Sequence, residues 1–250
     1  MVRMPIMAIS FGKIKVRLRN LRRSVMQNWS NYFSMRDWLK SYLNSQEGRQ
    51  ILQVIEEDEK QYAHYPILSD RFNAYNIKQE DIKIVLSDAY PDIRQPMFDN
   101  GYAWSNTQNI WTPKGDLLRW RIERDFQQQI EMPYKFDFSS LSQQGVFMPH
   151  QHLTLRWRAD IPHPQHYWDT LYWEALKYLV LTEEPKVFIL ICRDPGLFRT
   201  KALQRLNRKN YKHLILPSYD MGVFNRRINY FYSSHTFLKN RDIQPVNWTL

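Results

Sequence analysis

The sequence predicts an α/β fold, namely a three-layer α/β/α sandwich with a central four-stranded parallel sheet and an N-terminal basic extension. The first observation behind this prediction is that short apolar runs alternate with stretches of helical periodicity, which is typical of a sheet covered by helices. The second is that the runs are continuously apolar, as in strands buried on both faces. The third is that 43% of the 250 residues are hydrophobic, which is enough for a sizeable core.

The helices and strands are expected in a definite order. Residues 35–63 are predicted to be helical, because apolar residues recur at helical spacing from Trp38 to Ile55. Strands are expected at 82–86, 146–148, 186–192 and 213–216, and further helices at 168–181 and 228–238. The turn signal Gln144–Gly145 precedes the second strand, and Pro217 is expected to end the fourth. Ligands of parallel sheets bind outside the carboxyl ends of the strands, so a functional site is expected there.

The positive charge is concentrated at the start of the chain. The formal net charge is +10, and the first 36 residues contain eight Lys and Arg but no acidic residue, so they hold +8 of it. We therefore expect two parts, a basic N-terminal arm (1–36) and a globular domain (37–250). The cations predicted to bind nucleic acid are Arg3, Lys13, Lys15, Arg17, Arg19, Arg22 and Arg23.

The arm has two possible conformations and two possible roles. Alternation of Ile14, Val16 and Leu18 with cations fits an extended segment, while Leu21 and Val25 extend a helical spacing that fits a basic amphipathic helix. The arm could lie on RNA or DNA phosphates. Its Arg-rich, acid-free composition also resembles a mitochondrial targeting peptide.

Several functional classes are excluded by composition. A single cysteine, Cys192, cannot form an internal disulfide, and no apolar run approaches the roughly 20 residues of a membrane helix. The glycine spacing does not match a phosphate loop or a dinucleotide-binding motif. His150 and His152, and then His163 and His166, lack a cysteine partner and a third ligand, so no metal and no cofactor are expected.

The sequence around the strand ends resembles the uracil-DNA glycosylase family over most of the body, from Trp38 to Trp248. The family's first strand and loop, V-K-V-V-I-L-G-Q-D-P-Y-H, is similar to residues 82–93 (IKIVLSDAYPDI), and its G-L-x-F-S is similar to 101–105 (GYAWS). Its Q-G-V-L-L-L-N-x-x-L-T-V-R matches 144–156 (QGVFMPHQHLTLR). Weaker similarities follow at 163–171, 230–238 and 245–248. The resemblance implies the glycosylase fold.

In this gap-free alignment the family's chemical groups are replaced. Tyr90 stands where the resemblance implies an Asp that orients water and stabilises the sugar cation, and His150 stands where it implies an Asn that binds the uracil edge. The family's H-P-S-P loop has a His that stabilises the uracil anion, and the matching segment of this chain has Ser218 in its place. Trp104 retains the aromatic residue that stacks on the flipped base in the family. Asp92 stands where the family has the Tyr that excludes the methyl group of thymine.

These replacements predict a pseudoenzyme without a catalytic residue. An alternative is a shifted loop in which Asp88 or Asp92 takes the missing carboxylate role. Trp104 could stack on a base or could simply fill the core.

Together with the basic arm, the lost site predicts a structural component of a large RNA–protein assembly, the mitochondrial ribosome, in the mitochondrial matrix. The expected partners are rRNA and neighbouring ribosomal proteins, with no membrane and no small-molecule substrate. Two other hypotheses are an active, divergent uracil-DNA glycosylase in DNA repair and a DNA-binding accessory factor.

Overall fold

The computed structural model describes residues 34–66, 69–89, 99–106, 113–127, 138–156, 165–191, 203–205, 207, 212–218 and 224–248. Its central sheet has four parallel strands in the order β3-β2-β5-β6. These strands are β2 (Ile84–Ser87), β3 (Val146–Phe147), β5 (Val187–Ile191) and β6 (Leu214–Ser218). Every residue of β2 and β5 is buried, as continuous apolar runs predict. The α/β prediction is confirmed.

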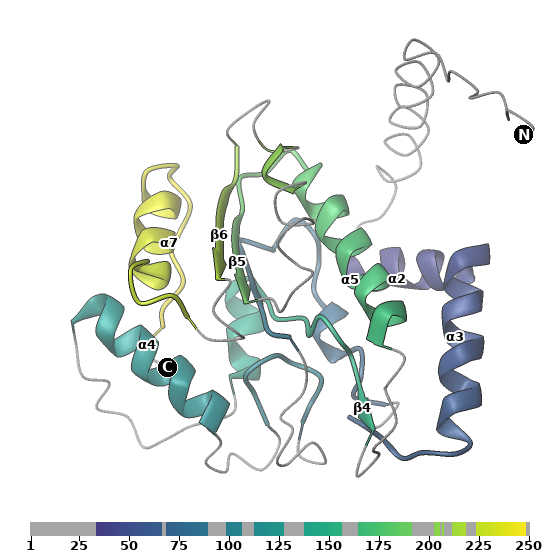
Figure 1. The fold of residues 1–250 in the computed structure, drawn as a ribbon. Helices are drawn as coiled ribbons and strands as arrows, with labels where there is room; N and C mark the ends of the chain where they lie inside the picture. The colour runs from purple at the N-terminus through teal and green to yellow at the C-terminus, as the bar shows by residue number, and fades with distance from the viewer. Residues whose placement is uncertain are drawn as a thin grey trace, which may run out of the picture. The chain divides into compact units, whose positions relative to one another are not determined.

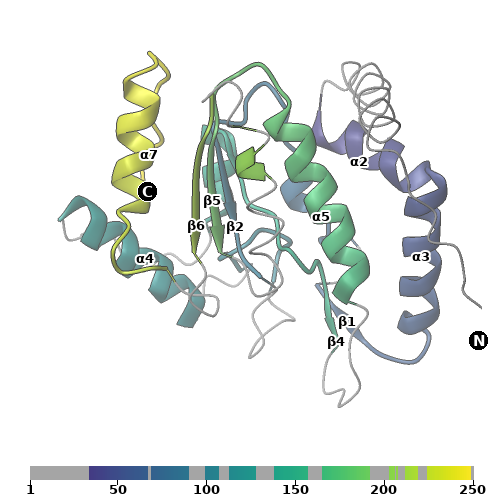
Figure 2. The same cartoon turned by 45° about the horizontal axis from the view of Figure 1, so that its top comes forward.

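Helices cover both faces of this sheet (Figures 1 and 2). One layer contains α2 (Met35–Asn44), α3 (Gln46–Glu59) and α5 (Gln165–Val180), and the other contains α4 (Pro113–Phe126) and α7 (Tyr230–Lys239). A small antiparallel pair joins β1 (His64–Tyr65) to β4 (Leu155–Arg156). Short 3-10 helices lie at η1 (Asn73–Tyr75) and η3 (Ser139–Gln144). Among the described helices, none has the length and apolar character needed to cross a membrane.

The predicted helical stretch 35–63 is two helices. Ser34 caps α2 by accepting a hydrogen bond from the Asp37 N–H at 3.1 Å, and Ser45 caps α3 by accepting one from the Gly48 N–H at 3.1 Å. A serine that caps a helix has extended backbone angles, so Ser45 ends one helix and begins the next.

The turn before β3 has the predicted glycine. Gly145 has φ of +90°, and a Cβ atom there would lie 2.3 Å from the Asp81 carbonyl oxygen. Only glycine fits this left-handed, crowded position. The expectation that Pro217 ends the fourth strand is wrong, because β6 continues through it to Ser218. In the described sheet β6 is the edge strand, where a missing N–H is tolerated.

A buried ion pair anchors α4 on α7. The Arg121 Nε lies 2.9 Å from the Asp125 Oδ1, and the second Asp125 oxygen accepts a hydrogen bond from the Phe231 N–H at 2.9 Å. The Arg121 guanidinium lies over the Tyr230 ring, 5.2 Å from its centroid. Burial raises the pKa of Asp125 and lowers that of Arg121. The far end of α4 is therefore fixed at the start of α7.

Candidate active site

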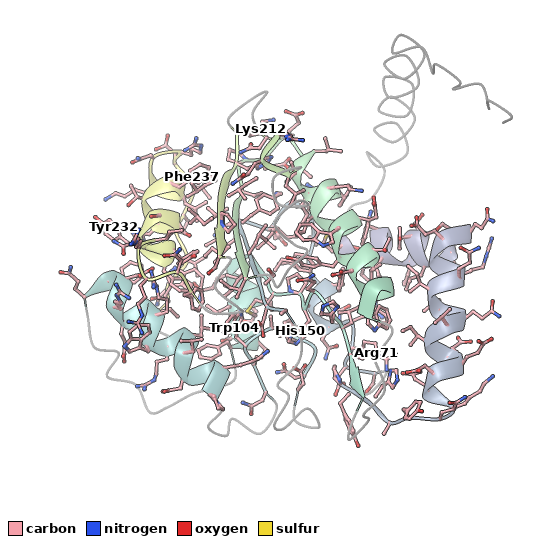
Figure 3. All side chains as sticks on the ribbon, viewed as in Figure 1. Arg71, Trp104, His150, Lys212, Tyr232 and Phe237 are labelled. Carbon is pink, nitrogen blue, oxygen red and sulfur yellow. The ribbon has the colours of Figure 1, made fainter. Side chains whose placement is uncertain are left out.

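The carboxyl ends of β2 and β3 bring an acid and an imidazole side by side. Asp88 follows directly after β2, and its backbone pairs with that of His150 after β3. The Asp88 N–H donates to the Pro149 oxygen at 3.4 Å, and the Gln151 N–H donates to the Asp88 oxygen at 2.8 Å. Parallel pairing thus continues past the assigned strands and fixes both residues at the edge where ligands of parallel sheets bind. Figure 3 shows His150 and Trp104 at this end of the sheet.

Asp88 is a buried carboxylate with a cationic partner. The residue is 2% exposed, and its Oδ1 accepts a hydrogen bond from the Ala89 N–H at 2.7 Å. Its Oδ2 contacts the Nζ atom of Lys114, which lies in the first turn of α4. A buried negative charge needs such a partner, since desolvation without one is costly. The arrangement pairs the Asp88 carboxylate with a cation at the end of the strand.

His150 is buried with free hydrogen-bonding capacity. It is 1% exposed, and its Nε2 lies 3.0 Å from the Asp99 Oδ2. The other Asp99 oxygen accepts a hydrogen bond from the Gly101 N–H at 2.8 Å, so the carboxylate is held in place. Within the described part of the chain, neither ring nitrogen of His150 makes a hydrogen bond of good geometry. Buried polar atoms are nearly always hydrogen-bonded, so an exception of this kind is a candidate for ligand binding.

Trp104 lies at the same strand ends but inside the core. Its Nε1–H donates to the Ser87 carbonyl oxygen at 3.4 Å, and the residue is 3% exposed. Its ring stacks on Phe224 with a centroid distance of 5.2 Å and an interplanar angle of 23°. Of the two predicted roles, this geometry favours core filling. A base could stack on Trp104 only if it displaced Phe224 or used the other ring face.

Ser218 is level with Asp88 but distant from it. Ser87 pairs with Leu190 and Ser218 pairs with Ile191, so β5 lies between the two residues. Two strand spacings amount to about 10 Å. The structure therefore brings His150 to Asp88 and leaves Ser218 apart.

Other predicted residues lie outside the described part of the chain. They are Tyr90, Asp92, Cys192, His163 and the arm cations Arg3, Lys13, Lys15, Arg17, Arg19, Arg22 and Arg23. Within the described ranges, no three His, Cys, Asp or Glu residues are grouped so that they could hold a metal ion.

Sequence reasoning missed Lys114 and Asp99. Lys114 is 26 residues from its partner Asp88, and α4 was not predicted because its apolar residues are few. Asp99 precedes the predicted G-L-x-F-S match by two residues, and nothing in its sequence context links it to His150.

Solved structures of uracil-DNA glycosylases share this fold. Among solved structures, mimivirus uracil-DNA glycosylase superposes with a TM-score of 0.67 at 18% identity and covers 85% of this chain and 84% of its own. A variant of mimivirus UNG in complex with UGI gives a TM-score of 0.65, also at 18% identity, over 85% of this chain and 86% of its own. These likenesses show the fold.

Sequence relatives name the family. A uracil-DNA glycosylase of Dictyostelium discoideum is 27% identical over 237 residues, which are 88% of this chain and 65% of the relative. Another, of Acinetobacter baumannii, is 26% identical over 208 residues, 79% of this chain and 83% of the relative. No family model matches the chain. In sequence and in fold the chain is therefore similar to uracil-DNA glycosylases, and it spans about two thirds of the Dictyostelium protein.

The prediction of a pseudoenzyme is therefore wrong, because the relatives are named as enzymes. That prediction depended on the register of the first motif. The gap-free alignment placed Tyr90 at the acid position, whereas β2 ends at Ser87 and Asp88 is the first side chain beyond it.

The description as an RNA-binding ribosomal protein of the mitochondrion is wrong for the same reason, since the relatives carry the name of a DNA glycosylase. The location in the mitochondrial matrix depended on residues 1–36, almost all of which lie outside the described part, and it stays a prediction.

Proposed function

We propose that this protein is an active, divergent uracil-DNA glycosylase that releases uracil from DNA, with Asp88 as its acidic catalytic residue. The observation that carries the proposal is the buried Asp88 carboxylate, paired with Lys114 and held in register with His150 at the carboxyl ends of β2 and β3. The substrate would be DNA and no cofactor is needed, since an acid, a hydrogen-bonding group and water are sufficient for the hydrolysis.

The spacing of the first motif supports Asp88. In residues 86–91 (LSDAYP), Asp88 and Tyr90 are separated by one residue, as the acid and the tyrosine are in the family's G-Q-D-P-Y-H. This register gives Tyr90 the role of excluding the methyl group of thymine. It removes the need for Asp92 at the site.

Asp88 would act on the sugar. As the bond between C1′ and the base breaks, positive charge develops on the sugar ring, and an ionised carboxylate placed beside it lowers the energy of that state. The same carboxylate can accept a hydrogen bond from the water that adds to C1′. A fixed, water-shielded carboxylate does this better than a solvated one, because it needs no reorganisation during the reaction.

His150 would act on the base. Its Asp99 contact orients the ring, and the nitrogen that does not face Asp99 remains for the edge of the base. With the ring proton on Nε2 toward Asp99, the Nδ1 atom is an acceptor and would bind an N–H at the edge of the base, which fixes the orientation of the base as it departs. Ser218 is a poorer candidate for this role, because it lies two strands from Asp88.

The test is uracil release from a single-stranded oligonucleotide that contains one uracil, measured as abasic sites per enzyme molecule. We expect release by the full chain, and a fall of about 10³-fold in Asp88→Asn, the scale typical for loss of a group that acts on transition-state charge. The control is Asp116→Asn. Asp116 lies in α4, the helix that contains Lys114, and its carboxylate accepts a hydrogen bond from Arg119. Absence of release by the unmodified protein would overturn the proposal, as would equal loss in both variants.

A further inference from the structure

The Lys114 amine is in contact with the carboxylate that the proposed function places at the sugar. We propose that Lys114 gives the protein a second activity, in which its amine forms a Schiff base with C1′ of an abasic sugar and the DNA backbone is then cleaved by β-elimination. The inference rests on the proposed function for one point only, that the sugar lies against Asp88.

The position of Lys114 suits a nucleophile. It is the second residue of α4, and its side chain is 22% exposed, whereas that of its partner Asp88 is 3% exposed. The amine thus reaches a buried carboxylate from the solvent side, where a substrate must enter. At its other end α4 is fixed by Asp125, which holds the Phe231 N–H.

The distances also suit the reaction. A carboxylate that stabilises charge on C1′ lies about 3–3.5 Å from it in a reactive complex. The Lys114 Nζ is within hydrogen-bonding distance of that same carboxylate. The amine is therefore one short contact from C1′, and rotation of the lysine side chain would bring it there without a change in the backbone.

The chemistry needs no reagent besides water. An abasic sugar opens to a C1′ aldehyde, the deprotonated amine adds to C1′, and water leaves to give the imine; Lys amines commonly form Schiff bases with carbonyl substrates. Asp88 is the adjacent base that can take up the ammonium proton. Loss of a proton from C2′ then forms a double bond between C2′ and C3′, and the bond between C3′ and oxygen breaks. The downstream strand departs with a 5′-phosphate, and water hydrolyses the imine to restore the amine.

A matched lysine is available as a control. The Lys212 side chain is also 22% exposed and is also paired with a carboxylate, that of Glu183. It lies just before β6, at the amino end of the sheet (Figure 3). The two lysines therefore have the same exposure and each has an acidic partner, but the partner of Lys212 is exposed and that of Lys114 is the buried Asp88.

The experiment uses the full chain and a single-stranded oligonucleotide with a preformed abasic site, so it does not depend on base release. Sodium borohydride reduces the imine to a stable amine and traps the protein on the DNA. We expect a trapped adduct whose modified peptide contains Lys114, and strand cleavage when borohydride is omitted. Lys114→Arg keeps the positive charge without a suitable nucleophile, and we expect at least a tenfold loss of adduct, with no loss in Lys212→Arg.

The outcomes separate this inference from the proposed function. No adduct with the unmodified protein, an adduct spread over several lysines, or equal loss in both variants would overturn the lyase activity. Uracil release without a trapped adduct would also overturn it and leave the glycosylase standing. An adduct at Lys114 without uracil release would support the lyase and overturn the glycosylase.

Discussion

The two ends of the central sheet each place a lysine and a histidine beside the strands, and they use these side chains in opposite ways. At the amino end, Lys186 precedes β5 and His213 precedes β6. At the carboxyl end, Lys114 and His150 stand around Asp88. Lys186, His213 and His150 are all buried, so burial alone does not separate the two ends.

At the amino end the polar atoms are satisfied by the backbone. The His213 Nδ1 accepts a hydrogen bond from the Lys186 N–H at 3.1 Å, so its Nε2 carries the proton and donates to the Val180 oxygen at 3.0 Å. The Lys186 amine donates to the oxygens of Gln79 and Ile82 at 3.3 and 3.1 Å. Burial lowers the pKa of His213 to about 4 and that of Lys186 to about 8. These side chains serve the fold.

At the carboxyl end the partners are other ionisable side chains. Lys114 pairs with Asp88, and His150 faces Asp99 without a well-formed hydrogen bond. Such groups keep capacity for a ligand, at a cost to stability. Residue type and burial recur at both ends, so the two ends differ in hydrogen bonding: Lys186 and His213 bond to the backbone, whereas His150 faces a carboxylate without a well-formed hydrogen bond.

The largest effect that we expect from changing a residue at either end of the sheet is on the rate of uracil release, at the carboxyl end. We predict that His150→Ala lowers the rate about 10²-fold, because the hydrogen bond that positions the base is lost. Truncation of the buried ring leaves a cavity that lowers the free energy of unfolding by about 1–3 kcal/mol, but no well-formed hydrogen bond is lost in addition. Single-turnover kinetics and chemical denaturation measure the two quantities.

His150→Asn supplies the control for that variant, since it restores an amide of the kind that the family has at this position. We expect it to keep more activity than His150→Ala. A large loss of stability in His150→Ala with unchanged kinetics would mean that the two ends of the sheet do not differ in this way.

The next effect is acid destabilisation through His213. The unfolded chain takes up a proton near the ordinary histidine pKa of about 6.5, while the folded protein resists it until about 4. The contribution of neutral His213 is therefore present above pH ~6.5 and is lost as the pH falls, amounting to about 2 kcal/mol by pH ~5. Denaturation at both pH values should show a smaller loss in His213→Gln, and equal losses would contradict the assigned tautomer.

The smallest effect concerns Lys186 at alkaline pH. Its pKa is about 8 in the folded protein, whereas the unfolded chain keeps the proton to about 10.4. The unfolded chain thus binds more protons between these values, and stability should rise by about 2 kcal/mol between pH ~7 and ~9.5. Lys186→Met should lack this rise in denaturation curves at pH ~7 and ~9.5. A rise of the same size in the variant would assign it to another group.

Much of the fold could be predicted because burial on two faces leaves a clear pattern. The runs at β2 and β5 are continuously apolar, and α5 has an apolar residue at nearly every inward position. The α4 helix was missed because Gly115, Arg121 and Asp125 are among its five buried residues, so its inner face is partly polar. The pair β1–β4 has only two residues in each strand, too few for a period-two pattern.

The site was predicted less well because it depends on register and on distant contacts. The gap-free alignment put Tyr90 at the acid position, two residues after Asp88, and named Asp88 only in the alternative of a shifted loop. The periodicity of apolar residues does not locate the end of a strand to within one residue. The contacts of Lys114 with Asp88 and of Asp99 with His150 arise from tertiary packing, which spacing along the chain does not encode.

The anchoring of α4 on α7 has a mechanical consequence. Lys114 and Asp125 are eleven residues apart in one helix, which corresponds to roughly 16 Å along its axis. If the helix pivots as a rigid rod at Asp125, a tilt of about 5° carries its first turn about 1.4 Å sideways. An amine poised on a carboxylate would lose its contact over such a distance. The hydrogen bond from the Phe231 N–H to Asp125 therefore holds the helix at one end, and a small tilt about that point would move the Lys114 amine away from Asp88.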